Sequence, residues 1–189
     1  MSDIPPEPGT IIEYLERDHS VIKQLMDRFQ LSGTDKWGEV FRQLIEYLVR
    51  HEVAEEEVVF AHLLELLPGA AEVVEDTRAE QQRLALRLFE MERLSPHDPE
   101  FRDLLGHLRD EVLMHVAREE QVIIPFIRNS GAHDDAELVR RYELARTLAP
   151  SRPEAVLDEG ALEEEGHGLS GFIERLRSAV LAHPSIGRH

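Results

Sequence analysis

The sequence predicts an all-α protein: an up-down-up-down antiparallel four-helix bundle with additional C-terminal helices. One observation is that apolar residues recur every three or four positions, the spacing of one helix face, in four long stretches. Another is that Gly, Pro and Ser punctuate the chain between these stretches, while no stretch of convincing length alternates polar and apolar residues as a strand would. Four long helices with short connections favour antiparallel neighbours, and therefore a bundle.

Each of the four helices has one predicted inward-facing stripe. A capping box at Thr10 and Glu13 marks the start of the first helix. The stripes are, in chain order, Ile12, Leu15, His19, Ile22, Met26 and Phe29; Phe41, Leu44, Leu48, His51, Glu55, Val58 and His62; Val73, Asp76, Glu80, Leu84, Leu88 and Met91; and Phe101, Leu104, Leu108, Val112, His115, Glu119, Val122 and Phe126. Pro125 should kink the last turn of the fourth helix, because proline removes a helical hydrogen bond.

The C-terminal part of the chain predicts a different organisation. We expect a shorter fifth helix over about 134–148, then a linker rich in Pro, Gly and acidic residues over 150–168. A last amphipathic helix over 169–180 could lie on the bundle or on a partner chain, and we favour the bundle. The predicted division is therefore 1–148 for the bundle with its fifth helix and 149–189 for the linker and last helix.

The composition excludes several classes of function. A net charge of -17, from 38 acidic against 21 Lys and Arg residues, would repel phosphate backbones and anionic lipid surfaces, so we expect neither nucleic acid nor membrane as a partner. No apolar run approaches the roughly 18 residues of a membrane span. The N-terminal MSDIPPEPGT lacks the basic and apolar regions of a secretory signal, and we expect a cytoplasmic location. The absence of Cys leaves imidazole and carboxylate as metal ligands.

Polar residues interrupt all four stripes at similar predicted heights along the bundle. These residues are His19, His51, Glu55, Asp76, Glu80, His115 and Glu119. A carboxylate on a core stripe is costly unless it is paired or bound to a metal, so several of them together predict a bound cation. Imidazoles and carboxylates without thiolates suit two redox-active first-row metals, iron first and manganese second.

Ordinary structural roles compete with the metal interpretation. Each histidine alone would fit a hydrogen-bonded core residue, whereas the set of three favours a metal site. Glu56, Glu57 and Glu120 fall off the stripes and are expected on the solvated face. Asp76 could be a metal ligand or a residue that does not contact the metal, and the sequence leaves both alternatives open. Tyr47 could pack in the core or reach the site as a hydrogen-bond donor.

Three motifs carry a family resemblance: Asp18-His19, HEVAE at 51–55 and HVARE at 115–119. In this order across four helices, they resemble the hemerythrin-like family of cation-binding HHE domains over about residues 10–128. The resemblance implies a non-haem di-iron centre, in which two carboxylates and an oxo or hydroxo group bridge the metals.

The resemblance also implies a role for each matching residue. Glu55 and Glu119 would be the bridging carboxylates, with His19 and His51 on one iron and His115 on the other. The third motif departs from the family pattern of His-x-x-x-Glu or His-x-x-x-His, because this chain has Asp76-Thr-Arg-Ala-Glu80. The first ligand there is therefore a carboxylate or is lost.

These inferences predict a protein whose metal centre meets a small oxidant: dioxygen, peroxide or nitric oxide. One hypothesis is a redox enzyme, for instance a peroxide-consuming, catalase-like one. A second is a binding or sensor module that responds to iron or oxygen without turnover. A third is a metal-free helical bundle.

Overall fold

A computed structural model describes residues 9–131 and 136–152, and every regular element in these ranges is helical. The α-helices are α1 (Ile11–Leu31), α2 (Trp37–Ala54), α3 (Ala61–Leu66), α4 (Ala71–Glu92), α5 (Pro99–Arg118), α6 (Ile124–Ser130) and α7 (Ala136–Leu148). A short 3-10 turn, Thr34–Lys36, precedes α2. Two π-helical segments, Glu55–Phe60 and Glu119–Ile123, join α2 to α3 and α5 to α6.

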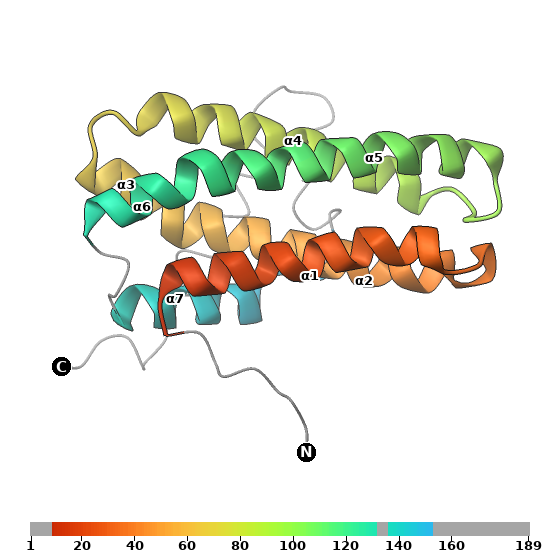
Figure 1. The fold of residues 1–189 in the computed structure, drawn as a ribbon, viewed down its shortest axis with the longest axis horizontal. Coiled ribbons are helices and arrows are strands. Elements are labelled where there is room, and N and C mark those ends of the chain that lie inside the picture. Colours follow the sequence, from red (N-terminus) through yellow and green to blue (C-terminus); the bar gives the residue numbers. More distant parts are fainter. Residues whose placement is uncertain (1–8, 132–135, 153–189) are drawn as a thin grey trace, which may run out of the picture.

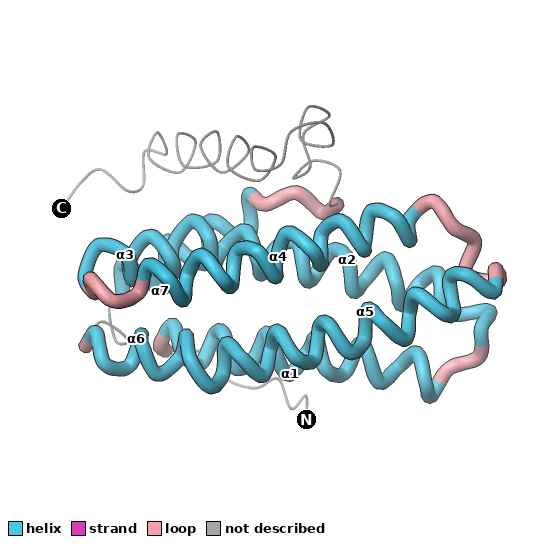
Figure 2. Tube along the Cα trace, turned by 90° about the horizontal axis from the view of Figure 1, so that it is seen from above, coloured by secondary structure: helices cyan, strands magenta, loops and turns pink. Residues whose placement is uncertain are grey.

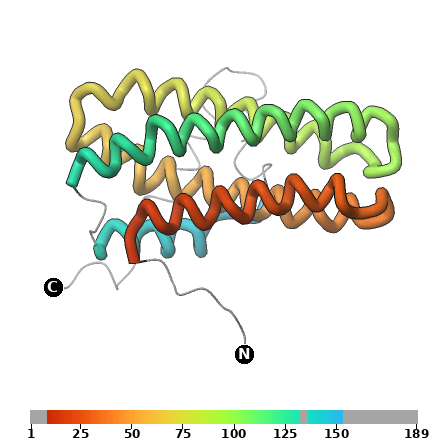
Figure 3. Tube along the Cα trace, in the orientation of Figure 1, coloured from red at the N-terminus to blue at the C-terminus, as the bar shows by residue number. Residues whose placement is uncertain are grey.

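The helices form an antiparallel bundle, which confirms the predicted fold class. The first π segment (Glu55–Phe60) makes α2 and α3 one continuous rod, and the second π segment (Glu119–Ile123) does the same for α5 and α6 (Figure 3). Figure 1 shows α1 beside α2 and α4 beside α5, with the two pairs stacked on each other. Helix α7 covers α2 on the side away from α4 and α5 (Figure 1), and Figure 2 shows that only short loops connect the rods of the bundle.

The start of α1 has the capping box that the sequence predicted. The Glu13 backbone N–H donates to Thr10 Oγ1 at 3.2 Å, and the Thr10 N–H donates to Glu13 Oε2 at 3.1 Å. Since these bonds satisfy N–H groups that the helix itself cannot, they fix where α1 begins.

Two hydrophobic clusters fill the bundle, one on each side of a polar layer. The first cluster includes Ile22, Leu48 and Phe101, and the second includes Leu15 and Phe60. Along α1 the change from one cluster to the other falls between Leu15 and Ile22, at the height of His19. Other helices change cluster close to their inward-facing His and Glu residues.

Each π segment moves the buried stripe by one position. Beyond the first segment Leu63 is buried instead of the predicted His62, and beyond the second Ile127 is buried instead of Phe126. A π turn holds one more residue than an α turn, so residues after it are rotated relative to a regular helix. Pro125 lies in the first turn of α6, where proline is tolerated, and the helical irregularity begins before it at the second π segment.

Two other expectations about side-chain orientation are wrong. The buried residues in the first half of α4 are one position further on than predicted: Val74, Thr77 and Gln81 instead of Val73, Asp76 and Glu80. Glu56 and Glu57 were expected on the solvated face but are buried in the first π segment. Glu56 is paired there with Arg78, whose Nε and Nη2 donate to it at 2.7 and 2.5 Å.

Among the residues described, none of the helices is both long and apolar enough to cross a membrane. The predicted fifth helix corresponds to α7, Ala136–Leu148. The last amphipathic helix, and the linker from residue 153 on, lie outside the described residues, so the proposed division of the chain at residue 148 stays a prediction.

Candidate metal centre

Six side chains converge in the polar layer midway along the bundle. Their donor atoms form two groups of four, and within each group these atoms lie within 4.8 Å of one another. The first group is His19, His51, Glu55 and Glu119, and the second is Glu52, Glu55, His115 and Glu119. Glu55 and Glu119 belong to both groups.

The Glu119 carboxylate faces both groups with different oxygens. Its Oε2 lies 3.1 Å from His19 Nε2 and 3.6 Å from His51 Nε2. Its Oε1 lies 3.0 Å from His115 Nε2. A carboxylate oriented in this way has the geometry to bridge two cations.

Helix α4 orients the second shared carboxylate. Gln81 Nε2 donates to Glu55 Oε2 at 3.1 Å, and the same oxygen lies 3.7 Å from His51 Nε2. The other oxygen of Glu55 is buried without a hydrogen-bond partner. It is therefore free to accept a cation.

A buried network beyond His51 fixes the orientation of its ring. His51 Nδ1 lies 3.1 Å from the Tyr142 hydroxyl, which donates to Asp18 Oδ2 at 3.2 Å. Tyr47 also donates to Asp18, at 2.9 Å, and Arg146 Nη1 lies 3.3 Å from it. Burial alone would raise the pKa of Asp18, but the nearby imidazole of His51, whose Nδ1 lies 3.6 Å from Oδ2, and the charge of Arg146 hold it below its usual range. Nδ1 therefore acts as the donor, and Nε2 faces the centre.

The other two histidines each have a carboxylate near Nδ1, which forms a hydrogen bond with His115 but not with His19. His19 Nδ1 lies 3.3 Å from Glu120 Oε1, and His115 Nδ1 lies 3.3 Å from Glu80 Oε2. Arg118 Nη1 donates to Glu80 at 2.8 Å, and the hydrogen bond to His115 together with this guanidinium lowers the pKa of Glu80. Nε2 of both rings faces Glu119, and Glu80 supports the ring of His115 from behind, as is usual for metal-binding histidines.

The chemistry of the donors fits bound metal ions. Nε2 of His51 and His115, both oxygens of Glu52 and one oxygen each of Glu55 and Glu119 are buried without a hydrogen-bond partner. Burial and the neighbouring Glu119 raise the pKa of Glu55 well above its usual value. Unpartnered lone pairs and repelling carboxylates are expensive in a protein interior, and cations would satisfy both. Imidazole and carboxylate donors without thiolate suit first-row metals.

The structure brings five of the predicted site residues into this centre: His19, His51, Glu55, His115 and Glu119. Asp76 is elsewhere. Its side chain is 59% exposed and its Oδ2 accepts from Arg118 Nη2 at 2.8 Å, so its expected inward orientation is wrong. Glu80 reaches the centre only through the ring of His115.

Sequence reasoning missed Glu52 and Gln81. Glu52 Oε1 lies 3.1 Å from His115 Nε2, and its side chain is only 12% exposed. A signal existed, because Glu52 lies three positions before Glu55 and residues at this spacing share a helix face. Gln81 has an equally weak signal, since a stripe through Thr77 and Gln81 reaches Leu84 as well as the stripe through Asp76 and Glu80 does.

A helical bundle with two adjacent, buried His and Glu groups is typical of a cation-binding protein. Residues 10–127 match the family described as the hemerythrin HHE cation binding domain, and the chain belongs to this family. The family predicted from the three motifs is thereby confirmed.

A curated relative named "DNA nickase", from Nostoc sp. (strain PCC 7120 / SAG 25.82 / UTEX 2576), is 31% identical over 129 residues. The alignment covers 67% of this chain but 36% of the relative, so the chain spans little more than a third of that protein's length. No solved structure matches the chain.

Proposed function

We propose that the centre holds two iron ions and reacts with a small oxidant, with peroxide as the first candidate. The observation that carries this proposal is the sharing of Glu55 and Glu119 by two groups of donors. Two adjacent iron ions can together exchange two electrons with an oxidant, which is the number that reduction of a peroxide to water requires. In a catalase-like reaction a second peroxide, oxidised to dioxygen, returns both electrons.

The residues of the chain give the two halves of the centre different character. The first group adds the imidazoles of His19 and His51 to the shared carboxylates, whereas the second adds His115 and the carboxylate of Glu52. Hard anionic oxygen ligands favour ferric over ferrous iron. The extra carboxylate therefore supports a role in oxidant consumption more than in reversible oxygen carriage.

Metal analysis is the first test of this proposal. Protein produced in iron-rich medium should hold about two irons per chain, and Glu119→Ala should lose most of both because it removes a shared donor. His107→Ala, which changes an exposed histidine on the helix that carries His115, is the matched control and should keep wild-type iron. Less than half an iron per chain after anaerobic ferrous reconstitution would contradict the proposal.

Steady-state kinetics separates the redox enzyme from the sensor alternative. An enzyme should consume hydrogen peroxide over many turnovers, and Glu119→Ala should abolish this. A sensor should react once per centre and then stop. A protein that contains iron but shows neither behaviour would leave only the metal-binding role of the family.

A DNA-directed role is the second candidate, supported by the name of the Nostoc relative. The net charge of -17 weighs against it, because phosphate backbones repel acidic proteins. Incubation of supercoiled plasmid with iron-loaded protein tests it directly. Nicking that persists when catalase removes peroxide, and that disappears in Glu119→Ala, would favour this role.

A further inference from the structure

The three tyrosines of the chain lie together beside the metal centre. The hydroxyls of Tyr47 and Tyr142 both donate to Asp18, at 2.9 and 3.2 Å. The ring of Tyr14 lies next to that of Tyr142, and the two ring centroids are 6.0 Å apart. Since the three residues come from α1, α2 and α7, the fold brings them together and not their positions in the sequence.

Tyr142 is in direct contact with a ligand of the centre. Its side chain is fully buried, and its hydroxyl oxygen lies 3.1 Å from His51 Nδ1 while its O–H donates to Asp18 Oδ2. A tyrosine loses an electron readily only if its proton leaves at the same time, because the oxidised phenol is a strong acid. Asp18 can accept that proton, since it is a carboxylate within hydrogen-bond reach. Tyr142 therefore has both partners that its oxidation requires.

Tyr14 continues this line of residues to the surface. Its side chain is only 3% exposed, but its hydroxyl donates to the exposed carboxylate of Glu143. Tyr14, like Tyr142, thus has a carboxylate that can hold its proton. The sequence of contacts from His51 through Tyr142 and Tyr14 to Glu143 runs from the centre to solvent.

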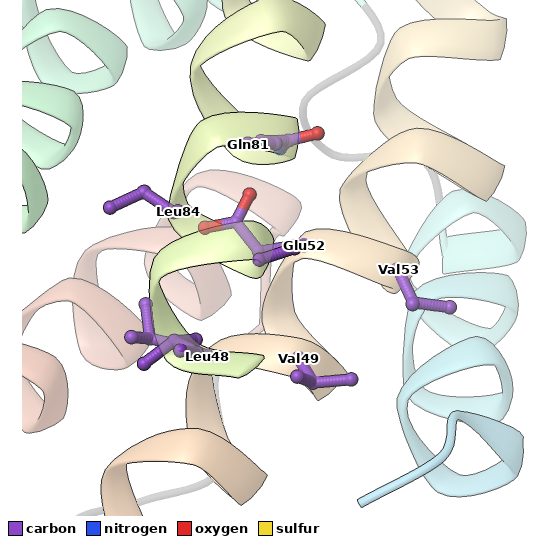
Figure 4. Close-up of a pocket in the computed structure, with 8 residues that line it drawn as sticks. Leu48, Val49, Glu52, Val53, Gln81 and Leu84 are labelled. Atoms are coloured by element: carbon purple, nitrogen blue, oxygen red, sulfur yellow. The ribbon is translucent and has the colours of Figure 1, made fainter. Parts of the chain in front are cut away.

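Buried side chains prevent a larger molecule from touching the donors directly. Five of the six donor side chains are at most 2% exposed, and the sixth, Glu52, is 12% exposed. Figure 4 shows Glu52 between Gln81 and Leu84 on the side that faces α4, and these two neighbours are at most 3% exposed. Electrons from a molecule much larger than peroxide must therefore pass through the protein.

We propose that Tyr142 and Tyr14 form a path, the tyrosine path, that carries electrons from a small reductant at the surface to the metal centre. A tyrosine passes one electron at a time, together with a proton. Reductants that give up one electron and one proton match this requirement, and these are enediols such as ascorbate, and phenols. This inference rests on the proposed function and specifies the class of reductant.

Each electron crosses the tyrosine path in balanced steps. Hydrogen peroxide first takes two electrons from the ferric centre and two protons from solvent, and becomes water. Tyr142 gives one electron to the centre through His51 and its proton to Asp18. Tyr14 then gives an electron to Tyr142 and its proton to Glu143, while Asp18 returns its proton to Tyr142. The reductant gives an electron to Tyr14 and its own proton to solvent, and Glu143 returns its proton to Tyr14. A second passage restores the ferric centre.

Electron paramagnetic resonance tests the first step of the path. Iron-loaded protein mixed with hydrogen peroxide in the absence of a reductant should show a tyrosyl radical, whose signal narrows in protein made with ring-deuterated tyrosine. Tyr142→Phe should lower this signal per bound iron at least about tenfold. Tyr47→Phe is the matched control, because it removes a hydroxyl from the same carboxylate without touching His51, and it should keep the signal within about twofold.

The rate at which ascorbate removes the radical tests the outer step. Tyr14→Phe should form the radical as wild type does, but ascorbate should remove it at least about tenfold more slowly in stopped-flow absorbance. Loss of the hydrogen bond to Glu143 would lower stability but would not change this rate. Since Tyr14→Phe leaves the contacts of Tyr142 with His51 and Asp18 in place, it keeps the test decisive if Tyr142→Phe does not fold or hold iron.

The outcomes separate this inference from the proposed function. The inference is overturned if no tyrosyl radical forms, if Tyr142→Phe keeps it, if Tyr47→Phe loses it equally, or if ascorbate removes it from Tyr14→Phe as fast as from wild type. Peroxide consumption without a tyrosyl radical would leave the proposed function standing alone. A radical at Tyr142 in protein that reacts only once per centre would support the first step and refute the redox enzyme. Protein that neither consumes peroxide nor forms the radical would refute both.

Discussion

Glu52 and Asp76 are both acidic residues on helices that line the centre, yet only Glu52 faces it. Glu52 lies one position after His51 on α2 and three before Glu55, so its carboxylate turns toward His115. Asp76 lies one position before the buried Thr77, and it pairs with Arg118 at the surface. A single step along a helix rotates a side chain by about 100°.

This difference gives a prediction for metal content. Glu52→Gln should lower the iron content from about two toward one per chain, because it removes the carboxylate that only the second group has. Asp76→Asn should leave the content unchanged, since its exposed ion pair contributes about 1 kcal/mol or less. Elemental analysis of both variants after identical reconstitution gives the answer. Equal iron loss in both would mean that the register of α4 differs from the one described.

Most of the candidate donors could be predicted from sequence because histidine and glutamate interrupted otherwise apolar stripes. Glu52 was missed despite its spacing of three from Glu55, since an acid beside a histidine in a charged stretch is most often solvated. Gln81 was missed for a related reason: Thr77 and Gln81 are weaker signals than Asp76 and Glu80 on the neighbouring stripe. The spacing of apolar residues cannot distinguish two stripes that are one residue apart when both lead to Leu84.

At the scale of elements, the two π segments begin at the two shared carboxylates. The first begins at Glu55 and the second at Glu119, each four residues after a histidine of the centre. Such wide turns are frequent at functional sites. Hydrophobic periodicity predicted the rods that contain these segments but not the segments themselves, because one extra residue shifts a stripe without ending the helix. That is why the buried residues beyond the two segments are Leu63 and Ile127, one position after the stripe residues His62 and Phe126.

Helix α7 connects a fifth element to the centre, and this connection can be tested. Tyr142→Phe keeps the ring but removes the hydroxyl between His51 and Asp18, so it should destabilise the protein by about 1–2 kcal/mol. It should also weaken metal binding about tenfold, since the ring of His51 loses its support. Denaturant unfolding and competition with a chelator measure the two effects.

Tyr14→Phe is the matched control for this variant. Tyr14 also connects α1 to α7, through a hydrogen bond with Glu143, but outside the centre. The control should lose stability and keep its metal affinity. If Tyr14→Phe and Tyr142→Phe weakened metal binding equally, α7 would act on the bundle as a whole and not through His51.

At the scale of the whole molecule, the donor side chains found among the described residues all lie before residue 120. A chain ending at Arg152 should therefore fold and bind wild-type amounts of iron, because truncation beyond the last described residue removes no donor and no residue of the two described clusters. Circular dichroism and metal analysis of the truncated protein check this. Loss of soluble, iron-bearing protein would show that the segment over 153–189 belongs to the folded core, against the predicted division of the chain.

The polar layer also gives a prediction for how the molecule unfolds. In the metal-free protein, repelling carboxylates separate the cluster around Phe101 from the cluster around Phe60, so each cluster can open as its own cooperative unit. Bound metal connects α1 with the two longer rods across that layer. At a free metal concentration about 1,000 times the Kd, binding adds about 4 kcal/mol to the free energy of unfolding. We expect one calorimetric transition for iron-loaded protein, and for metal-free protein a van't Hoff enthalpy below the calorimetric one. Equal enthalpies in both forms would mean that the two clusters are coupled without metal. If the difference is observed, the metal centre makes two adjoining folding units into one.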